Sequence, residues 1–146
     1  MASKLTPQQI ETYRREGYCF PVDGISREHA AAARTDLEAY EGKLGAPLTA
    51  AGREERYKLH VRLPWACDIA RHPAILDAVE DIIGPDILVW TSTFFIKEPE
   101  TSAITMWHQD ATYFGLRPHD HITAWVALSD ASASSGCMEF VPEDGA

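Results

Sequence analysis

Hydrophobic and polar positions in the first half of the chain follow the period of α-helices. The segment HPAILDAVEDIIGPD shows this most clearly, because its apolar residues recur on one face and Gly84-Pro85 stops it. The segment TPQQIETYRREG predicts a shorter helix that Thr6 caps and Gly17 ends, with Pro7 at the first helical position. These signals place one helix between Thr6 and Gly17 and another from near Pro73 to the stop at Gly84-Pro85.

A third helix is predicted from SREHAAAARTDLEAYEG, which is rich in alanine, capped by Ser26 and closed by Gly42. The next stretch, KLGAPLTAAGREE, carries glycines, a proline and charges, and these predict a mobile loop. The segments YCFPV and RYKLHVRL predict short strands, and a further helical stretch is expected after the second of them.

The pattern changes after Pro85. The segments ILVWTSTFFIK, ITAWVALSD and CMEFV are rich in β-branched and aromatic residues, and turn-forming stretches separate them, which is typical of strands. A helical first half followed by a strand-rich second half predicts the α+β class. A sheet core faced by helices, with a double-sheet jelly roll as one arrangement, fits this order.

Composition narrows the function classes. The 146 residues suit a single domain over 1–146, and the net charge of −9 argues against a nucleic-acid partner, which needs a basic surface. Three widely spaced cysteines form neither a disulfide framework nor a zinc pattern. The polar N-terminus lacks the apolar stretch of a signal peptide, and no apolar run approaches the ~20 residues of a membrane helix. We therefore expect a cytoplasmic protein without a membrane partner.

The segment WHQDATYFG carries the candidate chemistry. On a strand His108 and Asp110 would project to the same side, where an imidazole and a carboxylate can bind one cation. Non-haem iron sites use two histidines and one carboxylate and leave positions open for substrate and O₂. A His-x-Asp pair also occurs by chance, so the pair alone leaves an ordinary polar turn as the alternative.

From Ile87 onward the chain resembles the phytanoyl-CoA dioxygenase family of Fe(II)- and 2-oxoglutarate-dependent oxygenases. The matching text is FFIKEP, then WHQDATYFGLRP, then TAWVALSDASASSGCMEFVP, and RHPAILDAVEDIIGPDIL resembles the helix that leads into the family's first core strand. The resemblance implies N-terminal helices packed on a partial double-stranded β-helix. It also implies Fe(II), 2-oxoglutarate as co-substrate, and hydroxylation of a small-molecule or acyl substrate.

Carried over residue by residue, the resemblance makes His108 and Asp110 the first two iron ligands. Trp125 matches a tryptophan near the 2-oxoglutarate, with a core aromatic as the alternative. Lys58 resembles a lysine that reaches the co-substrate's carboxylate, and an exposed strand lysine is the alternative. Thr93 falls where the family lines the co-substrate pocket, and core packing is its alternative. The carboxylate of Asp110 favours hydroxylation, because related halogenases have a small residue there.

In the family that this chain resembles, the sequence after Val-Pro continues into further strands. Those strands hold a second iron-binding histidine and an arginine for the distal carboxylate of 2-oxoglutarate. Here the text reads Glu143-Asp144-Gly145-Ala146, so we expect the N-terminal portion of an oxygenase that is weakly active or inactive by itself. A further chain or a missing C-terminal segment would then complete the site. Such a portion should also expose apolar surface and unpaired strand edges.

Three histidines are alternative third ligands. His119 and His121 follow closely after Asp110, and either would make a local, zinc-like site; His60 could approach from KLHV. A polar loop with solvated histidines is the favoured interpretation of RPHDHIT. The alternative function is a non-catalytic domain that keeps part of the oxygenase fold and binds a ligand or a partner.

Overall fold

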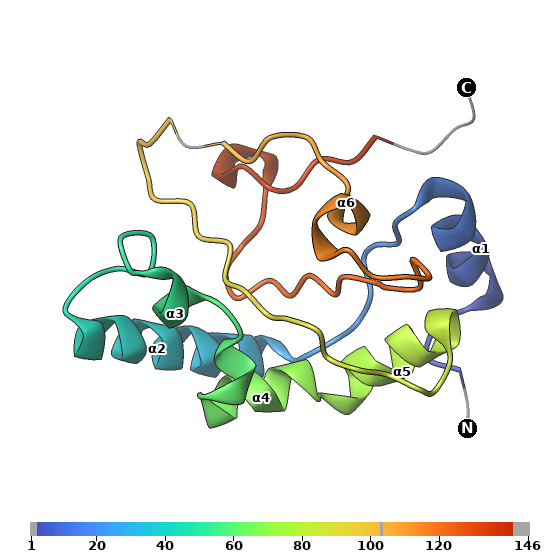
Figure 1. The fold of residues 1–146 in the computed structure, drawn as a ribbon, viewed down its shortest axis with the longest axis horizontal. Helices are drawn as coiled ribbons and strands as arrows, with labels where there is room; N and C mark the ends of the chain where they lie inside the picture. The colour runs from blue at the N-terminus through green and yellow to red at the C-terminus, as the bar shows by residue number, and fades with distance from the viewer. Residues whose placement is uncertain (1–2, 103, 142–146) are drawn as a thin grey trace.

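The computed structural model describes residues 3–102 and 104–141 (Figure 1). In Figure 1, α2, α4 and α5 follow one another along the lower edge, and the segment after α5 crosses the middle of the molecule beneath α6. The described helices are α1 (Pro7–Glu16), α2 (Arg27–Leu44), α3 (Arg53–Arg56), η1 (Leu59–Val61), α4 (Pro64–Ala70), α5 (Pro73–Ile83), α6 (Asp110–Phe114) and η2 (Ala133–Ser135).

Helix α1 begins and ends where its sequence predicts. The side chain of Thr6 accepts from the backbone N–H of Gln9 at 3.2 Å, and the Gln9 side chain accepts from the Thr6 N–H at 2.9 Å. This reciprocal pair is a capping box, which satisfies two N–H groups that a helix start otherwise leaves free. Gly17 then takes a left-handed conformation (φ 79°) and ends the helix.

Helix α2 begins at the predicted cap but runs past its predicted end. Ser26 accepts from the N–H of His29 at 3.1 Å, which confirms the start. The prediction that Gly42 closes the helix is wrong, because Gly45 takes the left-handed conformation (φ 70°) and donates to Glu41 O at 3.0 Å. An exposed glycine inside a helix costs only about 1 kcal/mol, so Gly42 does not stop it.

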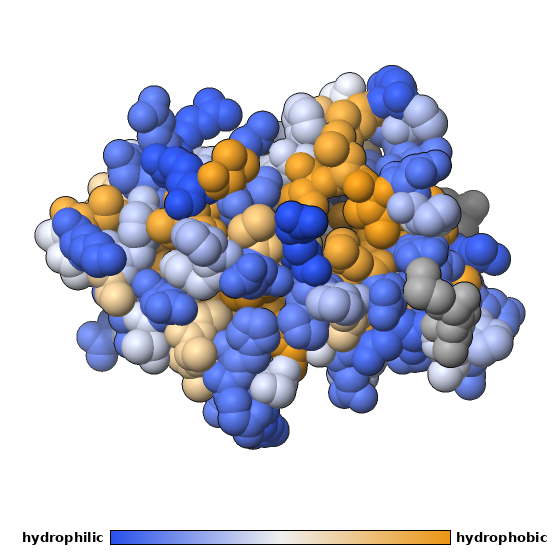
Figure 2. Space-filling view, turned by 90° about the horizontal axis from the view of Figure 1, so that it is seen from below, coloured by the Kyte–Doolittle hydropathy of each residue, from blue (hydrophilic) through white to orange (hydrophobic). Residues whose placement is uncertain are grey.

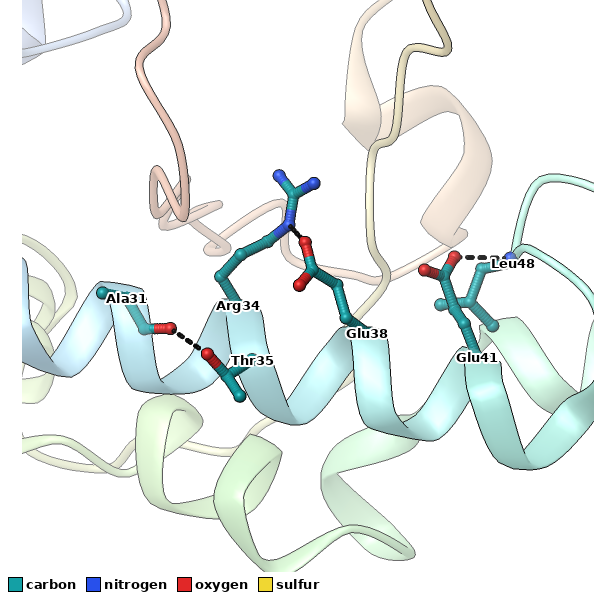
Figure 3. Close-up of polar contacts among 6 residues, drawn as sticks. All are labelled: Ala31, Arg34, Thr35, Glu38, Glu41 and Leu48. Atoms are coloured by element: carbon teal, nitrogen blue, oxygen red, sulfur yellow. Dashed lines mark hydrogen bonds and ion pairs between the residues drawn. The ribbon is translucent and has the colours of Figure 1, made fainter.

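The segment after α2 is anchored, although its composition predicts a mobile loop. Glu41 accepts from the backbone N–H of Leu48 at 2.7 Å, which holds the turn against the end of α2 (Figure 3). The Leu48 side chain is 1% exposed. A buried leucine contributes roughly 1.5–3 kcal/mol relative to an exposed one, and this outweighs the local glycines and proline.

Helix α5 occupies the predicted residues and ties down the start of the chain. It runs from Pro73 and ends at Gly84, with Val79 buried on its apolar face. The Asp81 carboxylate accepts from the backbone N–H of Leu5 at 2.7 Å, and Leu5 is 3% exposed. This hydrogen bond lowers the pKa of Asp81 from its ordinary value. Segments 76 residues apart in sequence are thereby joined.

The core lies where α2 meets the segment from η1 to α4. Leu37, Leu48, Leu59 and Ala66 are buried together, and Leu59 is fully inaccessible. Trp65 and Phe94 pack against this cluster, with their ring centroids 5.5 Å apart. The core therefore fixes the segment after α5 to the helices.

The predicted strands are the main difference between expectation and structure. A strand over 56–63 is wrong: α3 ends at Arg56, Lys58 has a positive φ of 54°, and Leu59–Val61 form a 3₁₀ turn that buries Leu59. In the described part of the chain, the β-pairing is one antiparallel bridge between Tyr57 and Thr93. Residues 18–22, 87–97, 122–130 and 137–141 are otherwise irregular. The helical part of the α+β prediction is confirmed, and the double-stranded β-helix stays a prediction.

Strand-like sequence without pairing leaves apolar surface exposed, as expected. Leu88, Phe95 and Val141 are 84%, 64% and 72% exposed. Figure 2 views the molecule from below and shows apolar residues gathered in the right half of this face, between hydrophilic ones. Within residues 3–102 and 104–141, no helix combines the length and the apolar character needed to cross a membrane.

Candidate metal centre

His108 and Asp110 lie on the same side of the chain, although they do not lie on a strand. Gln109 between them is extended (φ −113°, ψ 128°), and Asp110 opens α6. One extended residue is enough to place its two neighbours on one side. The Nε2 atom of His108 lies 3.4 Å from Oδ1 of Asp110. The predicted juxtaposition is thus present, and a shorter piece of extended backbone produces it.

Hydrogen bonds orient both side chains. His108 Nδ1 lies 2.7 Å from the backbone carbonyl of Met106, and a carbonyl only accepts, so Nδ1 carries the proton in this contact. Asp110 Oδ2 accepts from the hydroxyl of Thr123 at 2.5 Å. The ring of Tyr113 meets the His108 ring edge-on, with centroids 5.5 Å apart. Each side chain therefore has one atom engaged and one free.

The two free atoms face each other as acceptors. With Nδ1 protonated, neutral His108 presents a lone pair at Nε2 to a carboxylate oxygen, and two lone pairs at 3.4 Å need a cation or a proton between them. These two atoms would together hold a first-row metal ion. The side chains are 32% and 37% exposed, so an ion can reach them from solvent. A nitrogen and an oxygen donor of this kind fit Fe(II).

The third ligand is absent from the described residues, where no three His, Cys, Asp or Glu side chains form a group that could hold a metal ion. His119 contacts the Arg117 guanidinium instead. His121 packs edge-on against Phe114 at 5.3 Å. His60 Nδ1 contacts the Ser92 hydroxyl at 2.7 Å. The structure therefore brings none of the three alternative histidines to the pair.

Two of the three residues implied for the co-substrate are brought together by backbone contacts. Lys58 and Thr93 lie on neighbouring segments, since Tyr57 bridges to Thr93 and the Lys58 N–H donates to Ser92 O at 2.8 Å. The Lys58 ammonium lies 4.8 Å from the centre of the Trp90 ring, a cation–π contact. Trp125 is 42% exposed, two residues after the Thr123 that contacts Asp110. None of these three residues is buried: Lys58 and Trp125 are exposed and Thr93 is partly exposed.

Thr123 is the site residue that the sequence did not reveal. Its hydroxyl occupies one oxygen of Asp110 and so turns the other toward His108. The sequence ITAWVAL offered Thr123 only as one position of a predicted strand. Its contact spans 13 residues, and no local spacing rule predicts such a contact.

Comparison with known proteins settles the family. A family model described as phytanoyl-CoA dioxygenase (PhyH) matches residues 13–144. The chain belongs to the phytanoyl-CoA dioxygenase family. The resemblance seen from Ile87 onward is thus confirmed, and the match reaches back into α1.

Curated relatives of this phytanoyl-CoA dioxygenase family member include a Phytanoyl-CoA dioxygenase domain-containing protein 1 homolog from Caenorhabditis briggsae. It is 27% identical over 103 residues, which cover 70% of this chain and 36% of the relative. Phytanoyl-CoA dioxygenase domain-containing protein 1 from Danio rerio is 30% identical over 89 residues, which cover 59% of this chain and 30% of that protein. The chain spans about a third of the length of these relatives.

A solved structure is also similar. It is titled "Non-heme monooxygenase, ThoJ-Ni complex" and has 34% sequence identity and a TM-score of 0.62. The similarity covers 72% of this chain and 43% of that one. The arrangement of helices and irregular segments described above therefore matches part of a non-heme oxygenase.

Proposed function

We propose that this chain supplies two of the three protein ligands of an Fe(II) site in a 2-oxoglutarate-dependent oxygenase. The observation that carries the proposal is the pair of oriented, facing acceptors, His108 Nε2 and Asp110 Oδ1 at 3.4 Å. Family membership and the similarity to a non-heme monooxygenase support it. The substrate would be a small molecule or an acyl compound.

In this proposal His108 and Asp110 hold the metal, and the Met106 carbonyl and the Thr123 hydroxyl fix their orientation. When bound, Fe(II) with 2-oxoglutarate and O₂ supplies the oxidising power for hydroxylation of a C–H bond. The carboxylate at Asp110 favours hydroxylation over halogenation. Lys58, Thr93 and Trp125 are proposed to contact 2-oxoglutarate, and an ammonium such as that of Lys58 would pair with its carboxylate.

The third ligand is proposed to come from outside the described residues, either from a further segment or from another chain. The relatives extend well beyond the region that this chain matches, which supports a further segment. Because the described residues bring only two ligands together, we expect the 146-residue chain to bind metal and to turn over slowly or not at all.

Metal binding tests the proposal directly. Mn(II), a redox-silent substitute for Fe(II), would be titrated into the wild-type chain and the variants His108→Ala and Asp110→Ala, with free Mn(II) followed by electron paramagnetic resonance. His29→Ala, a histidine on α2 away from the pair in sequence, is the matched control. We expect each site variant to weaken binding at least tenfold and the control to leave it unchanged. Equal affinity in all four proteins would refute the proposal.

One observation favours the non-catalytic alternative. Several large apolar side chains between residues 88 and 141 are more than half exposed, which is typical of a surface that contacts another molecule. Succinate formation from 2-oxoglutarate, with Fe(II), ascorbate and O₂, separates the two functions. It would be measured for the chain alone and for a version extended with native downstream sequence. Metal binding by the extended version without succinate formation would favour the binding domain.

A further inference from the structure

A largely aromatic cavity, open to solvent, is lined by residues from three distant parts of the described chain. It has a volume of about 400 Å³ and is lined by Tyr18, Phe20, Trp107, Met138, Glu139 and Phe140. The Tyr18 ring stacks on Phe140 with centroids 4.7 Å apart and on Phe20 at 5.9 Å. Residues far apart in the sequence therefore build one wall, and Trp107 adds a fourth ring. This volume is at the small end of the range of small-molecule sites.

The aromatic rings and the carboxylate of the lining all favour a positively charged ligand. Tyr18 and Phe140 stack on each other, whereas Phe20 and Trp107 are the most exposed of the four rings. A thioether adds a polarisable sulfur, and Glu139 is the only charged residue among the six. Phe20 and Trp107 are 74% and 67% exposed, so their rings are free to contact a ligand. Rings grouped around one carboxylate attract a cation through both the ring quadrupoles and the charge.

We propose that this cavity binds a small organic cation of the quaternary ammonium class. An anionic ligand would meet Glu139 and the ring faces with the wrong sign. A neutral apolar ligand would gain burial only, without the attraction of the rings and the carboxylate. A methylated ammonium presents apolar methyl groups to the rings and spreads its charge over them, so it uses every feature of the lining.

Trp107, which lines the cavity, directly precedes the proposed metal ligand His108 in the sequence. A role of the bound cation as the oxygenase substrate would rest on the proposed function. The binding itself does not rest on it, since none of the lining residues is a proposed metal ligand. Binding can therefore be measured without metal.

The test compares choline with 3,3-dimethylbutan-1-ol, a neutral compound of nearly the same shape. Each would be titrated into the metal-free chain, with binding followed by ligand-observed NMR. We expect choline to bind at least about tenfold more tightly than the alcohol. Equal binding of the two compounds, or no binding of choline at millimolar concentration, would overturn the proposal.

Variants locate the binding. Trp107→Leu should weaken choline binding about tenfold, and Glu139→Gln about fivefold. Trp90→Leu is the aromatic control, because Trp90 contacts Lys58 outside the cavity. Glu11→Gln on α1 is the charge control, since it changes the net charge by the same amount. A control variant that weakens binding as much as its cavity counterpart would refute the site. Mn(II) binding by the same proteins reports on the metal proposal independently.

Discussion

The hydrogen bond from Thr123 to Asp110 gives a sharp test of how the candidate metal centre is built. Replacing Thr123 with valine keeps the shape of the side chain and removes only the hydroxyl that occupies Asp110 Oδ2. The carboxylate then rotates more freely, and Oδ1 no longer points steadily toward His108 Nε2. We expect metal affinity to fall, because the ion must then order the carboxylate itself.

The size of the effect follows from the exposure of the pair. A hydrogen bond to a charged group contributes roughly 1.5–3 kcal/mol, and Asp110 is 37% exposed, so solvent screening reduces this to about 1 kcal/mol. A loss of about 1 kcal/mol in binding free energy raises the dissociation constant of the metal roughly fivefold. Outer partners of metal ligands reach 10–100-fold in closed sites, and this open site should lie below that range.

The assay is a Mn(II) titration of wild type, Thr123→Val and Thr123→Ser, followed by electron paramagnetic resonance. Thr123→Ser keeps the hydroxyl and should bind like wild type, which separates loss of the hydrogen bond from loss of a methyl group. Thermal unfolding of each protein shows that the fold is intact. Wild-type affinity in Thr123→Val would refute the orienting role of the hydroxyl.

Three further predictions concern the core and the second group of site residues. Leu59→Ala should lower the free energy of unfolding by about 3 kcal/mol in urea titrations, because Leu59 is fully buried, whereas Val61→Ala at 71% exposure should change it by less than about 0.5 kcal/mol. Burial, with a smaller contribution from the Lys58 charge, lowers the pKa of His60 below 6.5. The contribution of neutral His60 to the free energy of unfolding is therefore complete above pH 6.5 and is lost as the pH falls through the lowered pKa. NMR titration should show this lowered pKa, and Lys58→Met should raise the pKa of His60. If Trp125 contacts 2-oxoglutarate, the metal-dependent fluorescence change on adding the co-substrate should largely disappear in Trp125→Phe, and an unchanged response would leave Trp125 a structural residue.

The helix ends show what could be predicted from the sequence. Thr6, Ser26 and Gly17 make hydrogen bonds to groups three or four residues away, so the local sequence is enough to identify them as helix caps. The end of α2 was missed because Gly42 and Gly45 are both acceptable stops locally. The position of Leu48 in the core favours the longer helix, and no spacing within α2 reports that contact.

The strands could not be predicted in the same way. A β-branched and aromatic pattern favours extended backbone, whereas a strand also needs a partner whose N–H and C=O groups lie opposite. Only Tyr57 and Thr93 meet in this way within the described part of the chain. Residues 56–63 additionally form a 3₁₀ turn because that turn buries Leu59.

By itself, the sequence determined the extent of α1, the start of α2, the stop of α5 and the juxtaposition of His108 and Asp110, because each depends on residues close together along the chain. It also indicated the family, through motifs spread over the second half of the chain. The tertiary structure alone decided which atoms of that pair are free, through the contact of Thr123 with Asp110. It also brought Tyr18 against Phe140 to form the aromatic cavity. Contacts of this kind join segments whose separation carries no periodic signal, since packing and not spacing selects them.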